Sequence, residues 1–72
     1  MYLAWFDDNP KHDQRRKLAD GAAAYQDRFG YPPNVALVHP EEVAEAPGLL
    51  VRAEGYIRRN NIWFGFEPFA AT

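Results

Sequence analysis

The chain has 72 residues, no cysteine and a formal net charge of −2, and 47% of its residues are hydrophobic. This length corresponds to one small domain, and the lack of cysteine excludes disulfide bonds, thiolate zinc sites and thiol nucleophiles. The acidic balance argues against a protein whose whole surface binds nucleic acid. The hydrophobic fraction is too high for a disordered chain.

The apolar runs are short, and 35–38 is typical of them. A membrane-spanning helix needs about 20 apolar residues, so we expect no membrane partner. The first residues lack the basic start of a secretory signal and turn acidic at Asp7, so we expect a cytoplasmic protein. The glycines stand apart from one another and form no phosphate-binding loop, so we expect no cofactor.

The first half of the chain indicates a strand followed by a long helix. The aromatic run 2–6 predicts the strand, and Asp8 or Asn9 is a suitable cap for a helix that starts at Pro10. The helix is predicted over 10–29, where apolar residues recur at spacings of three and four. Those residues are Leu18, Ala22, Tyr25 and Phe29. Gly30 suits the left-handed position that ends a helix.

The second half indicates shorter elements. The run 35–38 is apolar on both faces and predicts a covered strand, and 39–46 predicts a short helix. A third apolar run spans 49–51. The last two runs, 56–58 and 62–66, flank Asn60-Asn61 and predict a β-hairpin, because asparagine tolerates the positive φ of a tight turn.

These elements predict an α/β (α+β) domain over residues 1–72, with 68–72 as a frayed tail. Its order is strand–long helix–strand–short helix–β-hairpin, in a small mixed β-sheet with the long helix on one face. A strand–helix–strand unit favours a parallel pair, so we expect the first two strands to lie side by side. One helix covers only one face, so the other face must be polar, covered by the short helix, or buried against a partner.

A first candidate site lies where those two strands end. Parallel strands end at the same edge of a sheet, where ligands bind in open α/β folds. The residues that the topology brings there are Asp7, Asp8, His12 and His39. Carboxylates and imidazoles can hold a divalent cation, which would suit a metal-dependent enzyme. The alternative is that these residues cap the two helices.

A second candidate surface combines basic and aromatic residues near the end of the chain. Its members are Arg52, Tyr56, Arg58, Arg59 and Trp63. Aromatic rings on a sheet with nearby arginines can stack bases and bind phosphates, so nucleic acid is one candidate partner. The alternative is that the rings are ordinary cross-strand pairs and that the arginines form a solvated turn.

The third candidate is protein association through apolar side chains that a core this small leaves exposed. Those side chains are Tyr2, Trp5, Trp63 and Phe69. Serine is absent and the one threonine is Thr72, so nucleophilic catalysis has few candidate residues. We therefore expect a non-enzymatic interaction or regulatory module that binds a protein partner or forms a homo-oligomer through an aromatic sheet face. Nucleic-acid binding and metal-dependent catalysis remain the alternatives.

Overall fold

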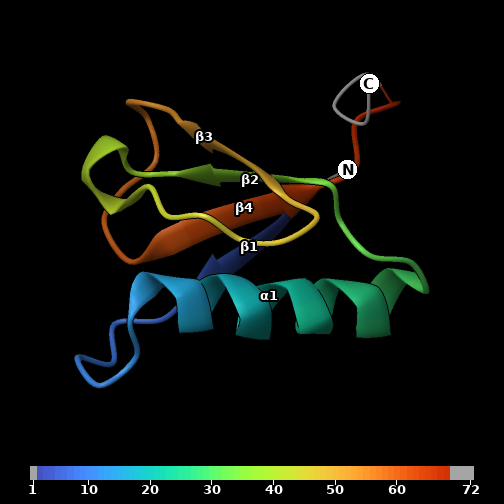
Figure 1. The fold of residues 1–72 in the computed structure, drawn as a ribbon, viewed down its shortest axis with the longest axis horizontal. Helices are drawn as coiled ribbons and strands as arrows, with labels where there is room; N and C mark the ends of the chain where they lie inside the picture. Colours follow the sequence, from blue (N-terminus) through green and yellow to red (C-terminus); the bar gives the residue numbers. More distant parts are fainter. Residues whose placement is uncertain (1, 69–72) are drawn as a thin grey trace.

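The computed structural model describes residues 2–68, so the predicted interaction residue Phe69 and most of the predicted tail lie outside the described residues. Figure 1 shows a mixed sheet with one long helix along one of its faces. The elements are β1 (Tyr2–Phe6), α1 (Gln14–Phe29), β2 (Val35–Val38), the 3-10 helix η1 (Pro40–Glu42), β3 (Leu50–Ala53) and β4 (Asn61–Gly65). The predicted fold class, a small α+β domain with its long helix on one face, is confirmed.

The strand order is β1-β4-β2-β3. β4 lies between β1 and β2 and runs antiparallel to both, so β1 and β2 point in the same direction without touching. The expectation that these two strands lie side by side is therefore wrong, although their common direction is right. β4 and β2 occupy the two central positions, and Ile62 and Phe64, which β4 turns toward α1, are 2% and 0% exposed.

The predicted hairpin does not form. Residues 55–57 form a turn and a bend instead of a strand, and β3 pairs in parallel with β2. Asn60 does take the positive φ of a turn residue, at 65°, but this turn leads from the loop 54–60 into β4. The side chain of Ile57 explains the difference, because it is buried against Val35 and Leu37 and holds the loop over the sheet.

Helix α1 starts four residues later than predicted, at Gln14, with Asp13 as its cap. The Asp13 carboxylate accepts a hydrogen bond from the Arg16 N–H at 2.9 Å. Residues before it are held in turns, because the Asp7 side chain accepts from the Asn9 N–H and the Asn9 side chain accepts from the Lys11 N–H. The predicted stop at Gly30 is confirmed by its left-handed conformation, φ 84°.

The short helix predicted over 39–46 is reduced to the three residues of η1. His39 caps it, since its Nδ1 accepts a hydrogen bond from the Glu41 N–H at 3.0 Å. The chain is extended at Val43 and turns at residues 47–48, and it carries β2 across to β3 on the side of the sheet that faces α1 (Figure 1).

The core lies between the sheet and α1. Its fully buried members are Leu18, Tyr25, Ala36, Val38, Ile62 and Phe64. Gly21 allows the closest approach, because a Cβ at that position would collide with the Phe64 ring and lie 3.0 Å from Trp5. A residue without a side chain is therefore required where α1 crosses β4.

Candidate interaction surface

The face of the sheet opposite α1 carries exposed aromatic side chains. Alternation along β1 and β4 sends Leu3, Ile62 and Phe64 toward α1 and sends their sequence neighbours to the opposite side. The apolar side chains exposed there are Tyr2 (38% exposed), Phe6 (62%), Trp63 (39%), Tyr56 (62%) and Leu50 (45%). We call this surface the open face.

Part of this face is covered by the chain itself. Ile57, from the loop 54–60, is 2% exposed and shields Val35 and Leu37 of β2. The neighbouring Tyr56 ring packs against Trp63, with ring centroids 5.8 Å apart. The loop thus covers β2 and leaves the half of the face formed by β1 and β4 open.

A polar network borders the open face at one end of the sheet. The Tyr2 hydroxyl donates a hydrogen bond to the Glu67 carboxylate, and Arg52 Nη1 donates to the same carboxylate at 3.2 Å. The bond from Tyr2, together with the charge of Arg52, lowers the pKa of Glu67, and the bond to Glu67 raises the pKa of Tyr2. The Tyr2 ring lies over Gly65, where a Cβ would come within 2.5 Å of it. The bond to Glu67 thus holds the Tyr2 ring over Gly65 of β4.

The residues predicted to bind nucleic acid are only partly brought together. Tyr56 and Trp63 are neighbours on the open face, as predicted. Arg52, however, lies within 3.2 Å of Glu67 and 3.9 Å of Glu54. The structure also pairs Arg59 with Glu41 and leaves Arg58 exposed. Two of the predicted phosphate-binding groups are thus already matched by carboxylates of the same chain.

The residues predicted to hold a metal are divided between two places. Asp7 and His12 lie together, with the carboxylate Oδ2 2.8 Å from His12 Nδ1, and Asp8 is exposed nearby in sequence. His39 instead caps η1. Asn60 lies between these two strand ends: its carbonyl accepts from the Asp7 N–H, and its own N–H donates to the Glu42 carboxylate. The predicted four-residue site is therefore not assembled.

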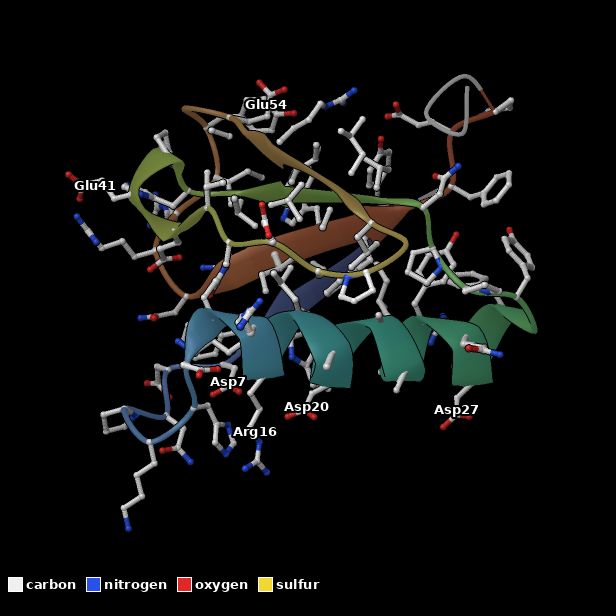
Figure 2. All side chains as sticks on the ribbon, viewed as in Figure 1. Asp7, Arg16, Asp20, Asp27, Glu41 and Glu54 are labelled. Atoms are coloured by element: carbon white, nitrogen blue, oxygen red, sulfur yellow. The ribbon has the colours of Figure 1, made fainter. Side chains whose placement is uncertain are left out.

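Asp20 takes the place that the sequence reasoning gave to Asp8 and His39. Ligand atoms of Asp7, His12 and Asp20 all lie within 4.8 Å of one another. Figure 2 shows Asp7, Arg16 and Asp20 together along the first half of α1, and Arg16 Nε lies 3.5 Å from Asp20. His12 precedes α1 and Asp20 lies in its second turn, so no helical spacing in the sequence indicated this contact.

Hydrogen bonds from His12 and from the Asn9 N–H lower the pKa of Asp7. The carboxylate therefore orients the imidazole, and the Arg16 guanidinium beside Asp20 offsets part of the negative charge. Carboxylates and an imidazole in this arrangement have the chemistry to bind a divalent cation, and metal binding at Asp7 and His12 stays a prediction.

Lys17 belongs to the basic stretch at the start of α1, and its burial was not predicted from the sequence. Its side chain is only 8% exposed, and its Nζ donates to the Asn60 side chain at 3.2 Å. Together with Glu42, it fixes the turn at Asn60 that leads into β4. A lysine four residues after a helix cap gives no signal of this kind, because such positions are usually solvated.

An apolar groove of about 740 Å³ runs between α1 and the segment 45–49. Its walls include Ala19, Ala22 and Leu49, with Arg15 and Glu45 also in the lining. Those two side chains carry opposite charges, so the groove offers no net charge that would select a ligand.

The chain matches no known family model, no curated protein and no solved structure. Within residues 2–68, no helix is both long and apolar enough to cross a membrane.

Proposed function

We propose that this protein is a non-enzymatic interaction module that associates with a second copy of itself through the open face. The observation that carries the proposal is the exposure of Tyr2, Phe6, Tyr56 and Trp63 on one side of the sheet, at 38–62% each. Exposed apolar side chains scattered singly are ordinary, whereas several on one face mark an interaction surface.

The exposed area supports a second copy as the partner. With about 200 Å² for each large side chain, the exposed fractions of the open-face residues leave about 500 Å² of apolar surface on each copy. Two copies that cover this surface bury about 1,000 Å² in total, which is close to the lower bound for a specific interface. We therefore expect a dimer that forms reversibly with rising concentration.

The charges around the open face also favour a protein over a nucleic acid as the partner. Arg52 is matched by Glu67, and Arg59 by Glu41. With two of its three arginines paired in this way, the surface has little net charge for a phosphate backbone, and the chain as a whole carries −2. Aromatic contact, which needs no charge, is the interaction that remains.

The proposal is tested by sedimentation velocity of the full chain over a range of concentrations. We expect the mass to rise from monomer to dimer, and Phe6→Lys to weaken the dimer by about tenfold or more, because it places a charge on the apolar surface. Val43→Lys is the matched control: Val43 is 54% exposed but lines a groove beside α1. This control should leave the dimer unchanged.

A wild-type chain that stays monomeric at every concentration would refute the proposal. Equal loss of the dimer in both lysine variants would also contradict it, because the effect would then come from charge alone. Nucleic-acid binding is the alternative outcome, and it would appear as salt-sensitive retardation of an oligonucleotide that Arg58→Ala abolishes.

A further inference from the structure

We infer that two copies meet along the outer edge of β1 and join their sheets through an antiparallel β1–β1 ladder with Ala4 opposite Ala4. This inference rests on the proposed self-association and makes it an edge-to-edge contact: Tyr2 and Phe6 of the two open faces meet across the joint, whereas Tyr56 and Trp63 stay exposed, so the two copies bury less than the full open face. Within residues 2–68, no strand pairs with the outer side of β1, which is the first strand in the order β1-β4-β2-β3. Unpaired strand edges are templates for another strand.

The backbone groups that point outward can be identified from the pairing. The Asp7 N–H donates to the Asn60 carbonyl at 3.0 Å, and these two residues continue the register that pairs Phe6 with Asn61. Hydrogen-bonded and non-bonded pairs alternate in an antiparallel ladder, so Leu3 and Trp5 direct their N–H and C=O groups toward β4. Tyr2, Ala4 and Phe6 therefore direct theirs away from the sheet.

This pattern is complementary to itself. In an antiparallel pair centred on Ala4, Tyr2 of each copy lies opposite Phe6 of the other. Each of the three outward-facing residues then donates and accepts one backbone hydrogen bond. Alanine at the centre places the smallest side chain where the two copies approach about the two-fold axis. A strand of another protein would have the same two-fold pattern of outward-facing groups and side chains only by coincidence.

The charges on β1 select the antiparallel arrangement. The strand itself has no charged residue, and two acids, Asp7 and Asp8, follow it directly. A parallel pair would place the acids of both copies side by side, with strong repulsion. An antiparallel pair moves them to opposite ends of the ladder, roughly 20 Å apart at about 3.4 Å per residue, which exceeds the screening length in physiological salt.

The other edge of the sheet, formed by β3, differs from β1 in its charge. β3 carries Arg52, whose guanidinium lies near Glu54 and Glu67, and charge on an edge strand opposes pairing. The Glu54 N–H donates to the Val38 carbonyl and the Leu50 N–H to the Asn34 carbonyl. By the same alternation, the N–H of Ala53 points outward, as the N–H of Ala4 does on β1.

The outward N–H groups of Ala4 and Ala53 provide a matched pair of variants. Ala4→Pro and Ala53→Pro each remove one outward N–H from an edge strand and leave the internal ladder intact. We expect Ala4→Pro to weaken the dimer by about tenfold or more, because the bond is lost from both copies, and Ala53→Pro to leave it unchanged. The measurement is sedimentation velocity of the full chain, with circular dichroism to show that each variant folds.

A second measurement does not depend on how the proline variants fold. The chain has no cysteine, so Ala4→Cys introduces the only thiol. Opposed residues in a hydrogen-bonded pair have Cα atoms about 5.5 Å apart, within the range of a disulfide. We expect Ala4→Cys to form a covalent dimer at least tenfold faster than Ala53→Cys under the same oxidant. Equal rates would overturn the ladder.

The outcomes separate this inference from the proposed function. If Ala4→Pro still forms dimers and Trp63→Lys does not, the two open faces pack against each other, and the ladder is wrong while self-association stands. If the wild-type chain forms no dimer, both fail. Loss of the dimer in Ala4→Pro alone, with rapid cross-linking of Ala4→Cys, establishes the ladder.

Discussion

The two faces of the sheet are built from alternate residues of the same strands, yet only one of them is closed. Along β4, Ile62 and Phe64 are 2% and 0% exposed and pack beneath α1, whereas Trp63 between them is 39% exposed. The closed side has a helix with a glycine at the point of closest approach. The open face has only the loop 54–60, which covers β2 through Ile57.

The difference shows that size and hydrophobicity do not decide which side chains form the core of this domain. Trp63 and Phe64 are both large aromatic residues on a central strand, and only the element above each one differs. A single helix of 16 residues covers one face, so the aromatic residues of the other face remain accessible. The closed side therefore holds most of the core, and the open side keeps the aromatic surface through which we propose association.

The largest expected effect comes from truncating each of these two neighbours. Phe64→Ala opens a cavity in the core and should lower the free energy of unfolding by about 3–5 kcal/mol, which is most of the stability of a domain this small. Trp63→Ala loses its contact with Tyr56 and should cost about 1–2 kcal/mol. Urea denaturation followed by circular dichroism measures both.

Equal losses of unfolding free energy in these two variants would contradict the difference between the two faces, because the open face would then be part of the core. Measurements at low protein concentration are required, since a dimer that covers Trp63 would add to the apparent stability.

A pair of glycine variants tests the same difference between the two faces of the sheet, with a smaller expected effect. A Cβ at Gly21 would collide with the Phe64 ring, which is fully buried, and a Cβ at Gly65 would collide with the Tyr2 ring, which lies on the open face. Gly21→Ala should cost about 1–2 kcal/mol, because overpacking exceeds the gain in helix propensity. Gly65→Ala should cost less than about 1 kcal/mol, since Tyr2 can turn toward solvent.

The measurement is again the midpoint of urea denaturation. A greater loss for Gly65→Ala than for Gly21→Ala would mean that Tyr2 is held as firmly as the core. In that case the bond between Tyr2 and Glu67 would contribute more than a surface hydrogen bond usually does.

The fold class, and the local elements that have strong sequence signals, could be predicted from the sequence alone. Residue type and hydrophobic period indicated the helix stop at Gly30, the strands at 2–6 and 35–38 and the turn at Asn60. The position of β4 between β1 and β2 could not be predicted, because it depends on how segments far apart in the sequence pair with one another. Period and turn residues specify elements, whereas strand order depends on contacts between distant segments.

For the candidate sites, the sequence indicated which residues could take part better than it indicated which of them lie together. Tyr56 and Trp63 were expected on one surface and lie in contact there. Asp7 and His12 were expected together and form a 2.8 Å contact, but Asn60 separates them from the end of β2, where His39 lies. That separation follows directly from the insertion of β4. The partners that neutralise Arg52 and Arg59 lie many residues away in sequence, so spacing gave no sign of them.

The smallest expected effect is a dependence of stability on alkaline pH that belongs to the closed side. Tyr25 is 1% exposed, and burial raises its pKa to about 12, from an ordinary value of 10.0. Because the folded pKa is the higher one, the stabilisation is fully present below pH 10 and is lost as the pH rises toward 12. Tyr25→Phe removes the contribution of Tyr25, since phenylalanine does not ionise, and leaves that of Tyr2, whose pKa is also raised.

Tyr25→Phe should therefore gain about 1 kcal/mol in the free energy of unfolding relative to wild type between pH 8 and pH 11, when both are followed by urea denaturation. Tyr56 on the open face is 62% exposed, so Tyr56→Phe is the control and should show no such gain. A gain of the same size in Tyr56→Phe would indicate that the tyrosine of the open face is as shielded as that of the core. The open face would then be closed within a single copy, and association through it would lose its physical basis.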